Sequence, residues 1–379
     1  MKILVLSVHT PSLFWFRMNM MQTFLENGHS VVAVGSEPED AWAEKFEAKG
    51  IEYRQIPVSR NGMNPLEDLK TQRAMEMLFR EIHPDKIFAY QAKAIVYGAV
   101  AAKKCGISEF YALVAGLGSI FRGSGLKNSL VRSVLTVQYK IACNFSRAVI
   151  FQNEDDRSEF VNRGIVNREK TRIIHGSGVD IHHFAEMPLP QSPGFLFVGR
   201  LIKDKGVREY LEACRIVKRE CPDALCMLVG PFDSNPSALS SEELDEFTKD
   251  GTVAYYGEQQ DVRPYLEKTS VYVLPSYHEG TPKSVLEAMA AGRAVVTTDA
   301  PGCRETVTNG VNGFLVEPKN ANAVAEAMLR LANDPALCRT FGKNSRKIAV
   351  EKYDVDKVNA SIMEIMSIKR ERAKSYGTV

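Results

Sequence analysis

The sequence lacks the motifs of several common nucleotide and cofactor sites. It contains no G-x-x-x-x-G-K-[S/T] stretch, which excludes a P-loop. The segment His9-Thr10-Pro11, which follows the first apolar run, lacks the glycines of a dinucleotide-binding turn, so a nicotinamide cofactor is not expected. No acidic D-x-D pair follows an expected strand, and the seven histidines have no metal-ligand spacing. The sequence therefore predicts neither a resident cofactor nor a metal ion.

Signals for secretion and for membrane insertion are also missing. No stretch approaches the roughly 20 apolar residues of a membrane span, and Met1–Val8 is too short and too soon polar for a signal peptide. The seven cysteines form no C-x-x-C pair and are odd in number, which favours reduced thiols in a cytoplasmic protein. The formal net charge is only +2, and no nucleic-acid partner is expected.

Apolar runs of strand length alternate with helical periodicity along the chain of 379 residues. This alternation predicts parallel α/β layers. Thirteen strands are expected, at residues 2–8, 30–35, 53–58, 86–90, 109–114, 148–153, 172–174, 195–198, 225–229, 253–256, 271–274, 294–297 and 313–316.

A proline-containing stretch without periodicity, residues 183–194, interrupts the alternation and is interpreted as an interdomain linker. It separates a domain of residues 1–182 from one of residues 195–355. The last helix, in residues 356–379, is expected to pack back toward the first domain, with Asp354-Val-Asp356 as its cap. We expect two facing, Rossmann-like, doubly wound parallel sheets, with ligands bound at the carboxyl edges of the strands and in the cleft between the domains.

The stretch Ser276–Glu287, which reads S-Y-H-E-G-T-P-K-S-V-L-E, connects an expected buried strand to an expected helix. A strand, a tight loop and a helix start place backbone N–H groups and a positive dipole end at the sheet edge, where anions bind. Two carboxylates, Glu279 and Glu287, would repel an anion and are better suited to holding hydroxyls. A sugar nucleotide has both features. The alternative interpretation is that both glutamates cap the helix.

A second charged loop, Gly199–Gly206, follows the first strand of the second domain. Its glycines flank Arg200 and Lys205, which suit a diphosphate: arginine grips it as a fork, and lysine supplies a compact charge. If the diphosphate is a leaving group, both cations stabilise the charge that develops in the transition state. The alternative for Arg200 is a surface salt bridge.

The segment from Lys86 to Arg147 is strongly basic, because it holds nine Lys or Arg residues and only one acid, Glu109. This pattern predicts either a face for phosphate or anionic lipid, or a solvated surface whose acids lie elsewhere in space. Within it, residues 126–144 are expected to form a helix whose apolar side contains Leu130, Val134, Ile141 and Phe145.

These motifs resemble those of a known enzyme family. The stretch E-G-T-P-K-S-V-L-E-A, from Glu279 to Ala288, is similar to the signature of retaining family-four glycosyltransferases with the GT-B fold. The Gly199–Gly206 loop is similar to their diphosphate loop. Residues 112–119, 228–236 and 274–287 resemble more closely the PglA-type enzymes, which add N-acetylgalactosamine to a polyprenyl-diphosphate-linked sugar, and Phe16-Arg17-Met18 also fits them. The resemblance covers nearly the whole chain.

The resemblance implies a UDP-sugar donor on the second domain and a lipid-diphosphate-linked saccharide acceptor on the first. Glu287 would hold the donor ribose, Glu279 would contact sugar hydroxyls, and both cations would hold the diphosphate. The implied catalytic residues are Glu279, Arg200 and Lys205. The implied donor contacts are Gly199, Arg200, Lys205, Glu279, Gly280, Thr281, Pro282, Lys283, Ser284, Val285 and Glu287. The implied acceptor contacts are Arg17, Lys93, Gly116, Gly118 and Ser119, and no metal site is implied.

One departure from the family affects the expected mechanism. Many relatives place a histidine immediately before Gly116, where this chain has Ala115, so no protein base is evident. A retaining reaction without a clear nucleophile implies front-face displacement, in which the leaving phosphate takes the acceptor proton. An anionic, membrane-bound acceptor also gives residues 86–147 a role, because Lys127, Arg132 and Lys140 would dock on anionic lipid of the inner leaflet. The enzyme is then expected to be cytoplasmic and peripherally membrane-associated.

Other functions on the same fold remain open. A sugar-nucleotide epimerase or hydrolase would use the same donor without an acceptor, and a phosphorylase would need pyridoxal phosphate on a lysine. A non-catalytic sugar-nucleotide-binding protein is a further alternative. The donor sugar is expected to be a hexose or N-acetylhexosamine, with N-acetylgalactosamine as the preferred interpretation.

Overall fold

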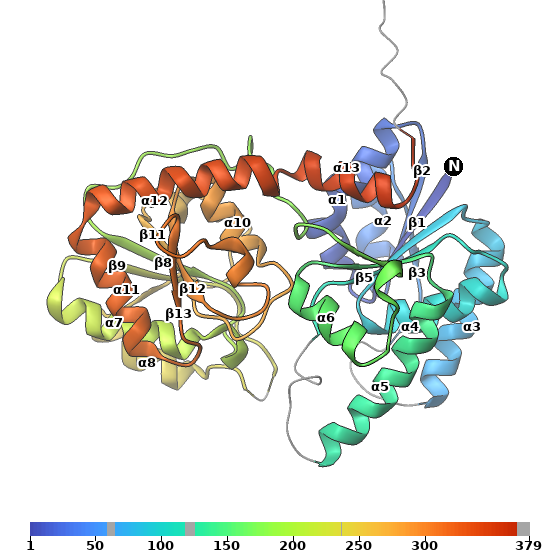
Figure 1. Ribbon diagram of the computed structural model, residues 1–379, viewed down its shortest axis with the longest axis horizontal. Coiled ribbons are helices and arrows are strands. Elements are labelled where there is room, and N and C mark those ends of the chain that lie inside the picture. Colours follow the sequence, from blue (N-terminus) through green and yellow to red (C-terminus); the bar gives the residue numbers. More distant parts are fainter. Residues whose placement is uncertain (59–64, 118–125, 236, 370–379) are drawn as a thin grey trace, which may run out of the picture. The chain divides into compact units, whose positions relative to one another are not determined.

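The structure, a computed structural model, describes residues 1–58, 65–117, 126–235 and 237–369 (Figure 1). By its internal contacts the chain forms two compact units. Unit 1 contains Met1–Ser177 and the chain from Val358 on, and unit 2 contains Gly178–Lys357. Each unit has a parallel sheet covered by helices, which confirms the predicted α/β class.

Unit 1 is built on a seven-stranded parallel sheet in the order β3-β2-β1-β4-β5-β6-β7. Its strands are β1 (Lys2–Leu6), β2 (Ser30–Gly35), β3 (Glu52–Gln55), β4 (Lys86–Tyr90), β5 (Phe110–Val114), β6 (Ala148–Phe151) and β7 (Thr171–Ile173). From β1 the chain adds β2 and β3 on one side of the sheet, and then β4 to β7 on the other side, with all strands parallel. The carboxyl ends of β1 and β4 are therefore the switch point, where open α/β sheets bind ligands.

Helices cover both faces of the unit 1 sheet, because alternate strand residues point to opposite sides. Leu4 and Ile87 belong to a core with α3, α4, α5 and α6, and Ile3 and Phe88 to a second core with α1, α2 and α13. The helices are α1 (Thr10–Glu26), α2 (Glu39–Glu47), α3 (Pro65–Ile82), α4 (Ala92–Lys104), α5 (Leu126–Phe145), α6 (Glu154–Asn162) and α13 (Val355–Ile365). From Val358 on, α13 packs in unit 1, and Asp354 Oδ1 accepts a hydrogen bond from the backbone N–H of Asp356 near its start.

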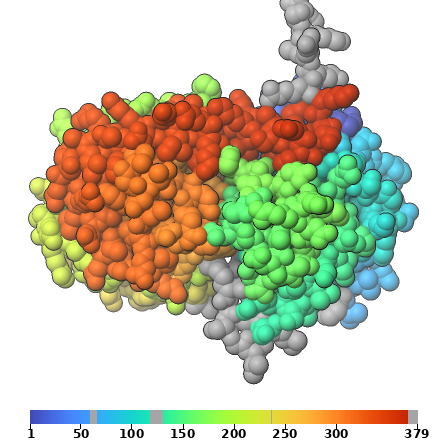
Figure 2. All heavy atoms as spheres, viewed as in Figure 1, coloured from blue at the N-terminus to red at the C-terminus, as the bar shows by residue number. Residues whose placement is uncertain are grey.

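The apolar side expected for α5 is only partly buried. Val134 and Ile141 are exposed, together with Val137, while Tyr139 and Ala142 face the core. Apolar residues occur on more than one side of this helix, so periodicity did not identify its buried side. Part of α5 (teal) lies at the surface in the view of Figure 2.

Unit 2 is built on a six-stranded parallel sheet in the order β10-β9-β8-β11-β12-β13. Its strands are β8 (Gly194–Val198), β9 (Leu225–Val229), β10 (Ala254–Tyr255), β11 (Val271–Leu274), β12 (Ala294–Thr298) and β13 (Gly313–Val316). Its helices are α7 (Val207–Glu220), α8 (Ser241–Thr248), α9 (Arg263–Glu267), α10 (Lys283–Ala290), α11 (Ala321–Asn333) and α12 (Pro335–Ile348). The switch point lies between β8 and β11.

The segment before β8 is bound to unit 2 by two arginines. Arg346 donates hydrogen bonds to the carbonyls of Ile181 and Phe184, and the fully buried Arg293 donates two to the carbonyl of Pro188. Much of the stretch expected as a linker thus has fixed contacts with the unit that follows it.

Two helices, α6 and α8, were not predicted. In α6 only Asp156 and Phe160 are buried, so an apolar period is absent. In α8, Ser240 and Glu243 form a capping box, a signal that was present in the sequence. No helix of the described residues is long and apolar enough to cross a bilayer.

Candidate active site

Two loops meet at the switch point of unit 2. The loop with Arg200 and Lys205 follows β8, and the loop with Glu279 follows its neighbour β11. Because parallel neighbours end on the same sheet edge, loops far apart in sequence come together. The backbone N–H of Tyr277 donates to the carbonyl of Asp204 at 2.9 Å, which joins the loops directly.

Two glycines allow this close approach. Gly206 has φ +70°, and a Cβ there would lie 2.0 Å from the carbonyl oxygen of Pro275. Gly302, which follows β12, has φ +79°, and a Cβ there would lie 2.0 Å from the carbonyl oxygen of Glu279. Any larger residue at either position would force the loops apart. Three loops therefore pack around Glu279.

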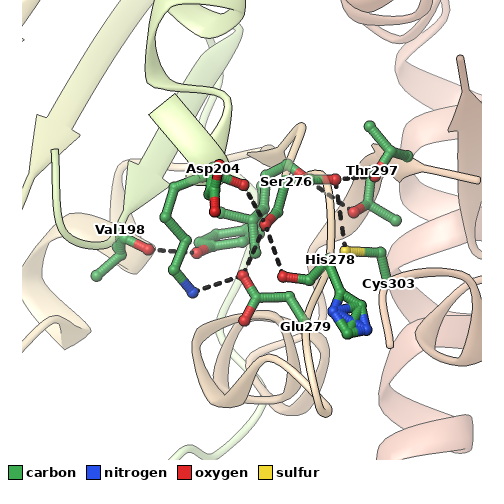
Figure 3. A network of polar contacts seen from close by, with 11 residues as sticks. Val198, Asp204, Ser276, His278, Glu279, Thr297 and Cys303 are labelled. Carbon is green, nitrogen blue, oxygen red and sulfur yellow. Dashed lines mark hydrogen bonds and ion pairs between the residues drawn. The ribbon is translucent and has the colours of Figure 1, made fainter. Parts of the chain in front are cut away.

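The Glu279 carboxylate belongs to a polar network in which Ser276 has the most partners (Figure 3). Its Oε1 lies 2.5 Å from Lys205 Nζ and 2.8 Å from Ser276 Oγ, while its backbone N–H donates to Pro301 at 2.9 Å. Ser276 Oγ also lies 2.9 Å from the carbonyl of Asp204. The Glu279 and Lys205 side chains are 12% and 23% exposed, so water screens their ion pair only partly. The geometry brings this predicted acid and cation together.

Arg200 also has a carboxylate partner. Its guanidinium donates to Asp233 Oδ2 at 2.9 Å, and Asp233 Oδ1 accepts from the backbone N–H of Asn235. Asp233 was not predicted as a site residue. The signal available was its position in the 228–236 stretch. Since Arg200 remains half exposed, the pair leaves guanidinium N–H groups accessible to a ligand.

Glu287 lies in α10 one turn from its start, and its carboxyl group is largely buried. Burial raises the pKa of Glu287 to about 7, although the Lys283 ammonium 3.8 Å away opposes this shift. The start of α10 has no side-chain cap, and its N-cap residue is Pro282. Glu287 lies inside α10 and not before its start, so the interpretation as a helix cap does not hold for Glu287.

The remaining predicted donor contacts lie around the same edge. Gly199 directly follows β8, and its N–H donates to the carbonyl of Val229. Gly280, Thr281 and Pro282 connect Glu279 to α10, where Lys283 and Ser284 form the first turn. Val285 is different, because its side chain is fully buried in the core and its N–H donates to Pro282.

The predicted acceptor contacts lie in unit 1. Arg17 is a buried residue of α1, and Lys93 forms an ion pair of 3.0 Å with Asp68. Gly116 follows β5 after the exposed Ala115. Gly118 and Ser119 lie outside the described residues. The structure thus describes three of the five residues.

The basic segment of residues 86–147 has partners elsewhere in space. Lys86 pairs with Glu109 at 2.7 Å, and Arg147 lies 3.9 Å from the same carboxylate. Lys93 and Lys104 pair with Asp68 and Glu76, which lie outside the segment. The local field is consequently weaker than the sequence count indicates. The side chain of Lys127 lies outside the described residues.

The residues described in the structure contain no group of three His, Cys, Asp or Glu side chains placed to hold a metal ion. The ion pairs described at this edge of unit 2 are instead Arg200 with Asp233 and Lys205 with Glu279, on loops, and Lys283 with Glu287, in α10.

Comparisons with known proteins identify the family of the chain. Residues 181–348 match the family model of glycosyl transferases group 1, and residues 2–153 match that of glycosyl transferase 4-like proteins. The Campylobacter jejuni N,N'-diacetylbacillosaminyl-diphospho-undecaprenol α-1,3-N-acetylgalactosaminyltransferase is 31% identical over 93% of this chain and 95% of its own length. An Escherichia coli UDP-Gal:α-D-GlcNAc-diphosphoundecaprenol α-1,3-galactosyltransferase is 23% identical over 80% of each chain.

Solved structures share the fold. HepE of Anabaena, in complex with UDP and glucose, matches 97% of this chain and 99% of its own with a TM-score of 0.78 and 20% identity. Sucrose-phosphate synthase from Thermosynechococcus elongatus matches 97% and 98% with a TM-score of 0.80 and 20% identity. The chain belongs to the family-four glycosyltransferases with the GT-B fold. It is an enzyme that transfers a sugar.

Proposed function

We propose that the enzyme transfers N-acetylgalactosamine, or a related hexosamine or hexose, from a UDP-sugar to a polyprenyl-diphosphate-linked saccharide, with retention of configuration. The observation that carries this proposal is the cluster of Lys205, Glu279 and Arg200 on two loops at the unit 2 switch point. The substrate class rests on the Campylobacter jejuni and Escherichia coli relatives, whose names specify acceptors linked to undecaprenyl diphosphate.

Unit 2 would bind the donor through groups suited to each of its parts. Arg200 and Lys205 bind the diphosphate, and Glu287 accepts hydrogen bonds from the ribose hydroxyls. Glu279 accepts hydrogen bonds from hydroxyls of the transferred sugar. In the structure both cations are paired with carboxylates, Arg200 with Asp233 and Lys205 with Glu279. The donor diphosphate therefore replaces ion pairs that already exist.

The chemical step proceeds on one face of the sugar. The bond between sugar C1 and the β-phosphate oxygen breaks as the acceptor hydroxyl oxygen bonds to C1 on the same face. The acceptor proton moves to the departing phosphate, because Ala115 stands where a protein base would be expected. Lys205 and Arg200 stabilise the negative charge that develops on the diphosphate. Glu279 steadies the partial positive charge on the sugar ring.

The experiment that tests this proposal is a donor screen. The enzyme is incubated with UDP-GalNAc, UDP-GlcNAc, UDP-Gal or UDP-Glc and a short-chain prenyl-diphosphate-linked N-acetylhexosamine. We expect release of UDP, a product heavier by one sugar, and an axial anomeric linkage by NMR. Free sugar released at the same rate without acceptor would instead indicate a hydrolase or epimerase. No turnover of any donor would contradict the proposal.

We further propose that the enzyme associates peripherally with anionic lipid through α5. Val134, Val137 and Ile141 form an exposed apolar stripe at helical spacing, with 44%, 58% and 44% of their surfaces accessible. Lys140 is exposed beside them. An apolar stripe flanked by a cation is typical of helices that lie in a membrane interface. We therefore assign the membrane contact to this side of α5 and not to the whole basic segment of residues 86–147, because several basic side chains of that segment form ion pairs.

Flotation with liposomes tests the membrane proposal. Wild-type enzyme should float with vesicles that contain anionic phospholipid. Val137→Asp and Lys140→Glu should reduce the bound fraction, whereas Lys249→Glu, an exposed substitution in unit 2, should not. Equal binding to neutral and anionic vesicles, unaffected by either α5 variant, would contradict this proposal.

A further inference from the structure

Arg17 is a buried cation without an acidic partner. The residue lies in α1 with only 3% of its surface accessible, and its Nε has no hydrogen-bond partner. Its guanidinium lies over the rings of Tyr90 and Phe88, 5.2 and 5.9 Å from their centres. Among the described residues, no carboxylate forms an ion pair with it. Burial lowers the pKa of Arg17, although Tyr90 opposes the shift.

This arrangement is unusual for a buried charge, because proteins normally pair or hydrogen-bond such groups. Arg293 gives a comparison within the same chain. It is also buried, but its two terminal nitrogens donate to the carbonyl of Pro188. Arg293 therefore has a structural partner, whereas Arg17 has only aromatic rings.

Arg17 lies beside the switch point of the unit 1 sheet. Tyr90, on which its guanidinium rests, is the last residue of β4, and its hydroxyl lies 2.8 Å from Ser12 Oγ. The next residue, Gln91, has φ +74° and accepts hydrogen bonds from Ser7 Oγ and the N–H of Val8. Unit 1 thus has an unpaired cation next to hydroxyl groups at the position where open α/β sheets bind ligands.

We propose that Arg17 binds a phosphate group of the lipid-linked diphosphate acceptor in unit 1. The inference rests on the proposed function and names the part of the acceptor that Arg17 recognises. A guanidinium fork matches two phosphate oxygens. The buried hydroxyl of Tyr90 is hydrogen-bonded to Ser12 Oγ, which fixes the ring on which the guanidinium rests. The acceptor phosphate thus provides Arg17 with the anionic partner that no described residue supplies.

Binding measurements test the proposal. Calorimetry is performed with UDP at saturation, so that unit 2 is occupied, using a short-chain prenyl-diphosphate-linked N-acetylglucosamine as the probe. Arg17→Met should weaken binding by about 10- to 100-fold, and Arg17→Lys should weaken it less. Inorganic pyrophosphate should show the same ranking if the anion alone is recognised. Octyl N-acetylglucosaminide, which has no phosphate, should bind wild type and Arg17→Met equally.

Thermal stability separates ligand binding from a structural role. Removing an unpaired buried charge should leave the melting temperature of Arg17→Met equal to or above that of wild type. Arg293→Met is the matched control and should lower it, because hydrogen bonds are lost. A fall in melting temperature for Arg17→Met, with unchanged affinity for the prenyl-diphosphate probe, would overturn the proposal.

Failure of this inference differs from failure of the proposed function. If only the inference fails, Arg17→Met still binds the probe with wild-type affinity, and the wild-type enzyme still transfers sugar. If the proposed function fails, wild-type enzyme transfers no sugar from any UDP donor.

Discussion

The two units have the same kind of sheet but treat the start of their first helix differently. In unit 1, Glu37 Oε2 accepts hydrogen bonds from the backbone N–H of Thr10 at 2.6 Å and from Ser36 Oγ. Burial alone would raise the pKa of Glu37, but these hydrogen bonds outweigh it and lower the pKa below its usual range. A protein carboxylate thus occupies the place where a helix start binds anions.

In unit 2 the helices at the switch point begin after Gly206 and Pro282, whose side chains cannot accept a hydrogen bond. Neither α7 nor α10 therefore has a side-chain cap. Lys205 and Arg200 add positive charge nearby. The comparison teaches that one architecture offers an anion site twice, and that a few residues decide whether the protein or a ligand supplies the anion.

The substitution of Lys205 in unit 2 should have the largest effect on turnover. Lys205→Ala should lower kcat by about 100- to 1000-fold, because a charge that stabilises the departing diphosphate is lost. Steady-state assays with the best donor from the screen measure this change. Lys249→Ala, in which the lysine lies on the surface of the same unit, should keep wild-type turnover. A decrease in kcat of less than tenfold for Lys205→Ala would contradict the proposal that the donor diphosphate binds beside Lys205 in unit 2.

The buried carboxyl of Glu287 should make unit 2 sensitive to pH. A folded pKa of about 7 lies above the usual 4.5, so the native state is favoured when Glu287 is protonated. Stability should fall by up to about 3 kcal/mol as pH rises from about 4.5 to 7. Glu287→Gln should remove this dependence in urea unfolding measured across that range. If the difference in unfolding free energy between wild type and Glu287→Gln did not change with pH, the raised pKa would not belong to Glu287.

The same carboxyl should couple nucleotide binding to pH. Ribose hydroxyls donate to an ionised carboxylate, so UDP affinity should rise by about tenfold between pH 6 and 8. Calorimetry should also detect proton release on binding near pH 7. Glu287→Gln should bind UDP more weakly and with no such pH dependence, and a pH-dependent affinity retained in that variant would assign the effect to another group.

Removing the carboxylate from the unit 1 helix start sharpens the comparison. Glu37→Gln should cost about 1–2 kcal/mol of stability, since charge-assisted hydrogen bonds to Thr10 and Ser36 are weakened. Because the folded pKa is lowered, this contribution is present above about pH 4.5 and is lost as pH falls through the folded pKa. Urea unfolding measures the change. UDP affinity should stay unchanged, and a large loss of that affinity would place the nucleotide in unit 1.

The smallest effect is expected at Asp233. Asp233→Asn frees Arg200 from its carboxylate, so the donor diphosphate no longer competes with it. Donor KM should fall about twofold to fivefold, in line with the modest energy of a half-exposed ion pair. Arg208→Lys, which changes a nearby ion pair with Glu243, is the control and should leave KM unchanged. A rise in KM for Asp233→Asn would mean that the pair positions Arg200 for binding.

The sheets and the loops of unit 2 could be predicted because their signals are local. Each of the thirteen predicted apolar runs overlaps a strand of the described residues, and a strand followed by a charged loop and a helix placed Lys205 and Glu279 at one edge. Their direct contact follows from the neighbouring positions of β8 and β11, which the sequence does not state.

Features that depend on tertiary partners could not be predicted. Val134 and Ile141 matched an apolar helix face, but the packing of α5 buries Tyr139 and Ala142 instead. The pairing of Arg200 with Asp233 joins loops that follow two different strands. The charge count of residues 86–147 also missed Asp68 and Glu76, which approach from α3.

The central claim is that unit 2, and not unit 1, binds the donor through Arg200, Lys205, Glu279 and Glu287. A crystal structure with a bound UDP-hexosamine tests it most directly. The account predicts diphosphate oxygens about 3 Å from Arg200 and Lys205 and ribose hydroxyls at the same distance from Glu287. A diphosphate at the start of α1, with Glu37 displaced and Lys205 still paired with Glu279, would contradict it.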